Sequence, residues 1–277
     1  MGAVGRFFLQ SKKKGGLNTV KSFKVLPGLF VALLLFVTAQ TALAQSTIFN
    51  IPSTDTVDKG KGYFEFDFLP QMPGSDSTRI YTYNPRLVAG VAKNVEAGVN
   101  FPTYHTTGLP ASSPATLGYI QPNIKWKYFS NDDAGVALAG GILWNTPLNH
   151  RSGQDSFGLI YTEVSKKVKS GMHGPRFHAG PYGVVGANVD DPTKPISFSG
   201  PRAGAILGYE QPVQGRVSFV ADWFSGKNNF GYFTPGVSIA VPGNGLFNAG
   251  YSFGNNSFEN SNAAKNRYLF VYYGVTF

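Results

Sequence analysis

Histidines and carboxylates are the residues of this sequence whose chemistry suits catalysis or metal binding. His178 alternates with Arg176 and Tyr182, so we expect the three side chains on one face of a strand. From that face His178 could pair with Asp222, as a hydrolase would require. The other three histidines fall in expected connections or at a strand edge, where solvated histidines are common: His105, His150 and His173.

No sequence motif turns these residues into an active site. The patterns G-x-S-x-G, H-E-x-x-H, Walker A and G-x-G-x-x-G are all missing from the sequence. The acidic pairs at 132–133 and 190–191 lack the ligand series of a calcium loop, so we expect solvated turns there. We therefore expect no enzyme and no catalytic, cofactor or metal site.

The composition excludes several classes of protein. The 277 residues include no Cys, which removes thiol nucleophiles, disulfides and Cys-based metal sites. Hydrophobic residues make up 42% of the chain, too many for a disordered protein, and the mean hydropathy of -0.10 is too low for a bundle of membrane helices. Six basic residues precede Val25, and from residue 45 onward 18 basic residues face 15 acidic ones. We expect no nucleic-acid partner.

The first 44 residues have the pattern of a secretory signal peptide. A basic stretch ends at Lys24, an apolar run follows to Val37, and Ala42 and Ala44 supply the small residues of a cleavage site. The alternative is an uncleaved anchor helix, but the apolar run is shorter than the roughly 18 residues of a spanning helix. We expect a Sec-type signal peptide at 1–44, a periplasmic lead-in or short plug at 45–59, and a barrel at 60–277.

Beyond residue 60 the sequence alternates polar and apolar residues, which indicates β-strands. At 63–68, for example, Glu65 and Asp67 alternate with three Phe. We expect twelve strands, at about 60–72, 79–91, 95–104, 119–130, 134–146, 156–168, 175–186, 198–213, 216–225, 230–241, 245–254 and 267–277. Long and short connections alternate between them, as in an up-and-down barrel with its long loops at one end. If 230–254 is one irregular hairpin, the count falls to about ten.

Charges of both signs share the face of these strands that we expect to line the lumen. They are Lys61, Glu65, Asp67, Arg86, Glu96, Lys125, Lys127, Arg176, Arg202, Glu210, Arg216 and Asp222. Because unpaired charge is costly in a dry interior, these groups must pair with one another or stand in water. Six glycines on the same face are expected to leave space unfilled, which favours a pore: Gly98, Gly204, Gly208, Gly236, Gly250 and Gly274.

The last strand indicates a class of protein. Its residues Leu269, Val271, Tyr273, Val275 and Phe277 form one apolar face that reaches the final residue. This face resembles the assembly signal of Gram-negative outer-membrane β-barrel proteins, although Val275 stands where an aromatic residue is common. The resemblance implies an all-β, up-and-down antiparallel transmembrane barrel in the cell outer membrane. Its implied partners are outer-membrane lipid, lipopolysaccharide and, through the last strand, the barrel-insertion machinery.

These features predict a narrow porin-like channel for passive diffusion of small polar or charged solutes, which the inward charges would screen. A closed structural barrel is the alternative, with partners bound by the loops at 106–118, 187–197 and 255–266. An outer-membrane hydrolase is the third possibility. The sequence leaves the solute and the oligomeric state open.

Overall fold

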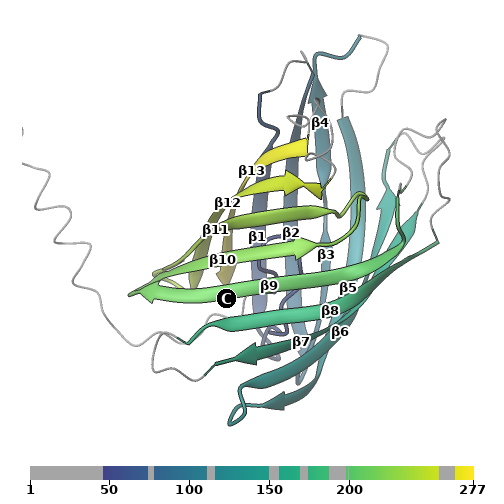
Figure 1. Ribbon diagram of the computed structural model, residues 1–277. Coiled ribbons are helices and arrows are strands. Elements are labelled where there is room, and N and C mark those ends of the chain that lie inside the picture. Colours follow the sequence, from purple (N-terminus) through teal and green to yellow (C-terminus); the bar gives the residue numbers. More distant parts are fainter. Residues whose placement is uncertain are drawn as a thin grey trace, which may run out of the picture. The chain divides into compact units, whose positions relative to one another are not determined.

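The computed structural model describes residues 46–73, 78–110, 116–149, 156–168, 174–186, 198, 200–255 and 266–277. Its strands wrap around one lumen (Figure 1). They are β1 Gly62–Pro70, β2 Arg79–Ala92, β3 Val95–Asn100, β4 Thr103–Thr107, β5 Thr116–Asn131, β6 Val136–Pro147, β7 Phe157–Lys167, β8 Arg176–Val185, β9 Ala203–Gln214, β10 Val217–Phe224, β11 Tyr232–Val241, β12 Gly245–Gly254 and β13 Arg267–Thr276. Among the described residues no helix is long and apolar enough to cross a membrane.

The strands form one closed antiparallel sheet. The ring closes where β1 pairs with β13, beginning with Tyr63 opposite Thr276. β3 and β4 share the partners β2 and β5, so they are two halves of one strand that is interrupted at Phe101 and Pro102. Pro102 has no N–H group to donate at this point, and the pairing resumes at Thr103. The predicted twelve-stranded barrel is confirmed, and with it the resemblance in fold to outer-membrane β-barrel proteins.

The region at 230–254 consists of two full strands. β11 and β12 pair from Tyr232 opposite Gly254 to Val241 opposite Gly245. Each of them also pairs with a second neighbour, β10 in one case and β13 in the other. The ten-strand alternative is therefore wrong.

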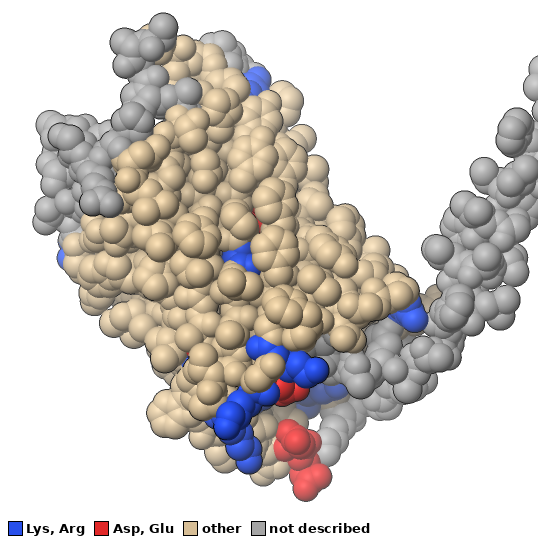
Figure 2. Space-filling model, turned by 180° about the vertical axis from the view of Figure 1, so that it is seen from behind, with Lys and Arg blue, Asp and Glu red and all other residues tan. Residues whose placement is uncertain are grey.

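Outward and inward faces of the strands differ sharply in polarity. On β5, Ile124 and Trp126 point outward and are 47% and 57% exposed, whereas Lys125 between them is 3% exposed. On β1, Phe64 points outward and Glu65 is buried. In Figure 2 most of the visible wall carries no charged side chain, and charged residues gather toward one end. The exterior is thus an apolar band, as in transmembrane barrels.

The connections differ in length between the two ends of the barrel. Asn94 and Asn244 lie in short turns with φ of 62° and 58°, a left-handed conformation that asparagine tolerates well. The turn at 132–135 is also short, whereas the connection at 225–231 is longer than the sequence indicated and joins the long loops. We call the two ends the short-turn end and the long-loop end.

The lumen is not polar throughout. At the long-loop end Phe157, Phe198, Phe224 and Phe230 form an aromatic cluster with ring centroids 5.5 to 5.9 Å apart. Phe157 is 6% exposed at one end of β7, and Glu163 is 1% exposed toward the other. The inward face of β7 therefore changes from apolar to polar along its length.

Candidate functional site

Residues 46–59 are called the lumenal segment here; residues 46–57 lie in the lumen, and Asp58 and Lys59 are exposed at its end. Its first part, residues 46–53, is a tight hairpin in which Thr47 pairs with Pro52. The Ile48 N–H donates to the Ile51 carbonyl at 2.9 Å and closes the hairpin. Ile48, Phe49 and Ile51 are no more than 1% exposed. The hairpin is therefore packed as tightly as a protein core.

The carboxylate of Asp222 on β10 holds the hairpin tip. Its Oδ2 accepts three consecutive backbone N–H groups, from Phe49 at 2.9 Å, Asn50 at 2.5 Å and Ile51 at 2.9 Å. The Asn50 side chain donates to Asp222 Oδ1 at 3.2 Å and to Thr234 Oγ1 of β11 at 2.7 Å. Successive N–H groups that converge on one anion form a nest. Asp222 thus binds the chain's own backbone.

Three lumenal glycines make room for the hairpin. Gly236 and Gly250 are cross-strand partners, and a Cβ at these positions would lie 2.5 and 2.6 Å from the Phe49 ring. A Cβ at Gly208 would lie 2.7 Å from the side chain of Ile51. The other three lie against side chains of the wall: Gly98, Gly204 and Gly274. The expectation that these glycines leave space unfilled is wrong, because the hairpin and the wall occupy that space.

The second part of the lumenal segment, residues 54–59, crosses the short-turn end of the lumen. Arg176 of β8 donates to both carboxylate oxygens of Asp55, at 2.5 and 3.0 Å. Thr54 Oγ1 lies 2.6 Å from Ser165 Oγ of β7, and both side chains are buried. Burial alone would raise the pKa of Asp55, but the Arg176 guanidinium lowers this pKa to about 2.

Glu96 on β3 contacts both ends of the lumenal segment. One carboxylate oxygen accepts the Ser46 hydroxyl at 2.5 Å, and the other accepts the Val57 N–H at 2.7 Å. Lys125 of β5 lies 3.0 Å from Glu96 and donates to the Ser46 carbonyl at 3.0 Å. The segment is therefore anchored to β3 and β5 as well as to β7, β8 and β10.

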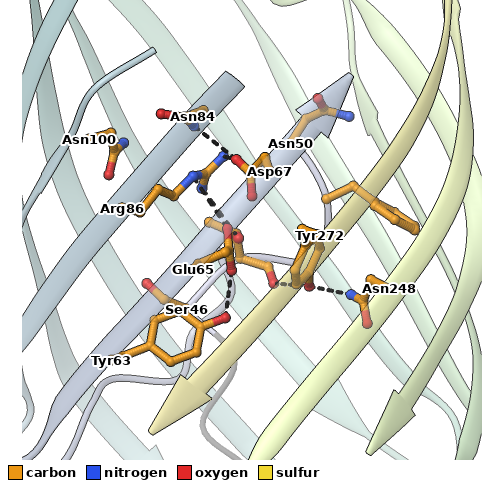
Figure 3. Close-up of polar contacts among 12 residues, drawn as sticks. Ser46, Asn50, Tyr63, Glu65, Asp67, Asn84, Arg86, Asn100, Asn248 and Tyr272 are labelled. Atoms are coloured by element: carbon orange, nitrogen blue, oxygen red, sulfur yellow. Dashed lines mark hydrogen bonds and ion pairs between the residues drawn. The ribbon is translucent and has the colours of Figure 1, made fainter. Parts of the chain in front are cut away.

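Other inward charges pair with one another. Arg86 on β2 lies 2.8 Å from Asp67 and 3.3 Å from Glu65, both on β1. Figure 3 shows the three side chains and their contacts. Of the remaining basic residues expected to line the lumen, two are exposed, Lys61 and Arg202, and two are half-buried, Lys127 and Arg216.

His178 is buried on β8 between two carboxylates. Its Nδ1 lies 2.5 Å from Glu163, and its Nε2 lies 2.6 Å from Glu210. Both ring nitrogens contact these carboxylates, and Asp222 accepts hydrogen bonds from the hairpin. The pairing of His178 with Asp222 is therefore wrong.

Of the other residues considered for chemistry, the structure describes His105 and the acidic pair at 132–133. His105 lies in β4, where its ring is 2.9 Å from Thr116, and the Ser130 hydroxyl donates to Asp132 at 3.0 Å in an exposed turn. Outside the described residues lie His150, His173, the pair at 190–191 and the expected signal peptide at 1–44. Across the described ranges, no group of three or more His, Asp or Glu residues could hold a metal ion.

A cavity of about 690 Å³ lies in the lumen beside the hairpin. Hairpin residues Ser46, Thr47 and Asn50 form one boundary, and the cavity reaches Ile80 and Thr106 toward the long-loop end. The polar part of its wall is rich in uncharged amides and hydroxyls: Thr82, Asn84, Asn100, Gln121, Asn123 and Asn145.

Sequence reasoning left the lumenal segment open between a lead-in and a plug. Two signals bear on this choice: Ile48, Phe49 and Ile51 are apolar outside any expected strand, and glycines gather on one side of the lumen at 208, 236 and 250. The bonds between hairpin and Asp222 join residues 171 to 173 positions apart, which no local pattern reveals. The domain boundaries at 44 and 59 stay predictions.

No protein-family profile matches the sequence, and no curated protein is significantly similar to it. Similar solved structures include an outer-membrane channel from Pseudomonas putida F1, 11% identical, with a TM-score of 0.49 over 87% of this chain and 100% of that chain. CdiB from Acinetobacter baumannii is 7% identical, with a TM-score of 0.38 over 78% of this chain and 60% of that chain. At these values neither structure bears on what this chain conducts or binds.

Proposed function

We propose that the protein is an outer-membrane channel for small polar solutes and that the lumenal segment closes it at rest. The observation that carries this proposal is the binding of the hairpin tip by Asp222 in the lumen. The rest of the segment is bound by Glu96 and Arg176, on strands elsewhere in the ring. A segment anchored on several sides of a barrel lies across its passage.

The width of the barrel suits both a channel and a closing segment. Eight-stranded barrels are filled by side chains, whereas barrels of about 16 strands hold an aqueous channel. In this twelve-stranded barrel the hairpin packs against β9, β11 and β12, and the cavity of about 690 Å³ lies beside it. Release of the segment would extend this cavity to the short-turn end.

The groups that hold the segment are compatible with its release. Asp222 and Glu96 are carboxylates, which would be stranded at high cost if they lost their partners in a dry core. In a lumen that fills with water they would be solvated instead. Opening therefore exchanges protein hydrogen bonds for water hydrogen bonds, which changes the free energy little for each bond.

The apolar exterior and the arrangement of loops support a place in the outer membrane, where short turns face the periplasm. Leu269 and Tyr273 of the last strand are 40% and 45% exposed on the outer wall, where lipid, lipopolysaccharide or the insertion machinery would meet them. Export through the segment at 1–44 belongs to the same proposal. Transport is passive in this account, since the sequence carries no energy-coupling motif.

The test is ion current through single barrels in a planar bilayer. Residues 45–277 and a variant that lacks residues 46–55 are refolded in detergent, and a heat-dependent gel shift establishes folding. We expect few openings from the first protein and frequent discrete steps from the variant. A full-length control with Ile48, Phe49 and Ile51 all changed to Ser should also conduct, because it keeps the chain length and loses the apolar anchors. A folded deletion variant without current would overturn the channel and favour the closed, loop-binding barrel.

A further inference from the structure

We propose that the cavity beside the hairpin binds an uncharged, hydroxyl-rich solute of the size of a mono- or disaccharide. As the solute of the channel, this ligand rests on the proposed function; its binding can be tested on the closed barrel. The cavity of about 690 Å³ lies within the range of roughly 300–1,000 Å³ that is usual for small-molecule sites. Four features of its wall support this class of ligand.

The first feature is a row of polar side chains across five neighbouring strands, which we call the polar belt: Glu65, Arg86, Asn100, Gln121 and Asn145. Cross-strand register places Glu65 opposite Arg86, Arg86 opposite Asn100, and Asn100 opposite Gln121. Asn100 donates to Gln121 at 3.3 Å, and Gln121 donates to Asn145 of β6 at 2.8 Å. The belt therefore presents to the cavity an ion pair, Glu65–Arg86, and a chain of hydrogen bonds from Asn100 through Gln121 to Asn145.

The amides of the polar belt have capacity for a ligand. An amide carries two N–H donors and an oxygen with two lone pairs. In the belt, Gln121 uses one donor toward Asn145 and one acceptor toward Asn100. Among the described atoms, one donor and one acceptor are left at Gln121. A hydroxyl group also donates and accepts, so it matches this pattern better than a carboxylate, which only accepts, or an ammonium, which only donates.

The second feature is a pair of buried acceptors next to the polar belt. Asn84 donates to Asp67 Oδ2 at 2.8 Å, while Asn84 Oδ1 and Asp67 Oδ1 have no hydrogen-bond partner among the described atoms. Both residues line the cavity and are 7% and 0% exposed. Figure 3 shows them beside Arg86 and Asn100. Both oxygens are closed off from the cavity in this state. Because buried acceptors without donors are costly, a rotation that turns either oxygen toward a ligand hydroxyl would be favoured.

The third feature is the charge balance of the cavity. Its lining contains three acidic and three basic residues: Glu65, Asp67, Glu96, Arg86, Lys125 and Lys227. Arg86 is bound by Asp67 and Glu65, and Lys125 is bound by Glu96. To reach Arg86 or Lys125, an anion would have to displace these carboxylates, and to reach the carboxylates a cation would have to displace their basic partners. An uncharged ligand requires neither exchange.

The fourth feature is the aromatic part of the wall. Tyr104 and Tyr119 line the cavity with ring centroids 5.8 Å apart and planes at 81°. Tyr119 lies two residues before Gln121, on the same face of β5. Tyrosine offers an apolar ring and a polar hydroxyl. Such rings suit sugars, whose faces carry C–H groups and whose edges carry hydroxyls.

The test is a binding titration of refolded residues 45–277 in a detergent without a sugar headgroup. Binding is measured by saturation-transfer difference NMR. The probes are sucrose, the cation glucosamine and the anion gluconate. We expect sucrose to bind more tightly than either charged probe. Gln121→Met should weaken sucrose binding about tenfold, the effect of roughly one lost hydrogen-bond partner. Gln211→Met makes the same chemical change outside the cavity and should leave binding unchanged.

A second variant covers the case in which Gln121→Met does not fold. Gln121→Glu keeps the shape of the side chain and adds a negative charge, so it should shift preference from sucrose toward glucosamine. Tighter binding of gluconate or glucosamine than of sucrose by the unaltered barrel overturns the proposal. If the deletion variant conducts and sucrose does not bind, the saccharide site fails and the channel stands. If sucrose binds and no variant conducts, the channel fails and the site remains as a binding site.

Discussion

Asp222 is the residue whose removal tests closure most sharply. Asp222→Ala takes away the one acceptor shared by the N–H groups of Phe49, Asn50 and Ile51, which it holds at 2.9, 2.5 and 2.9 Å. Asp222→Asn keeps an oxygen acceptor of similar shape and loses the charge. We expect both changes to release the hairpin, and Asp222→Ala to do so more strongly.

The size of the effect follows from the number of bonds. A buried donor left without its acceptor costs about 1–3 kcal/mol, so three of them cost at least about 3 kcal/mol. Since about 1.4 kcal/mol is a factor of ten, Asp222→Ala should shift the docking equilibrium at least about a hundredfold. Charge-assisted hydrogen bonds are roughly twice as strong as neutral ones, so Asp222→Asn should shift it about tenfold.

The assay is hydrogen–deuterium exchange of the refolded barrel, read by mass spectrometry on peptides that cover 46–57. Exchange in this segment should accelerate at least about a hundredfold in Asp222→Ala and about tenfold in Asp222→Asn. Exchange in the strands β1–β13 should stay unchanged. Glu163→Gln is the matched control, because Glu163 is an equally buried lumenal carboxylate that binds His178 instead. Unchanged exchange at 46–57 in folded Asp222→Ala would refute the role given to Asp222.

Two further predictions concern other contacts of the lumenal segment. Because the pKa of Asp55 is lowered from 3.8 to about 2, its pairing with Arg176 stabilises docking at neutral pH and is lost as the pH falls from about 4 to 2. The pairing contributes about 1–2 kcal/mol, since the carboxylate is 29% exposed and partly screened. Openings of the unaltered barrel in a bilayer should therefore become more frequent over this pH range. Asp55→Asn lacks the ion pair with Arg176 at every pH, so its opening frequency should stay constant over the same range. Equal pH profiles for both proteins would count against the pairing. Gly250→Ala places a Cβ 2.6 Å from the Phe49 ring and should make openings more frequent. In a barrel that already carries Phe49→Ala, the same change should have no effect. An equal increase in both proteins would show that Phe49 does not fill this space.

The barrel could be predicted from the sequence because its determinants are local. Alternation in a stretch such as 123–128 assigns inward and outward faces without knowledge of any partner strand. The structure places Lys125 inward and Trp126 outward as this pattern requires. The break at Pro102 was missed, because a single proline within a strong alternating pattern does not show whether the strand ends or resumes.

The state of the lumen could not be predicted in the same way. Glycine in a strand has the same local signature whether it borders empty space or a side chain from elsewhere. Gly236 and Gly250 border Phe49, which is more than 180 positions away in the sequence, so their meaning depends on a distant contact. An inward carboxylate such as Asp222 also has the same local sequence pattern in both cases, because either water or backbone N–H groups can bind it.

The central claim is that current flows only when the lumenal segment leaves its place, and a reversible lock tests it most directly. Thr54 Oγ1 and Ser165 Oγ are 2.6 Å apart, so cysteines at both positions suit a disulfide, and the chain has no native Cys to interfere. In single-channel recordings of Thr54→Cys/Ser165→Cys, the oxidised barrel should stay closed, and reduction should restore openings at least as frequent as those of the unaltered protein, because the hydrogen bond between the two hydroxyls is gone. The same current before and after reduction, with the disulfide shown to form, would contradict the account.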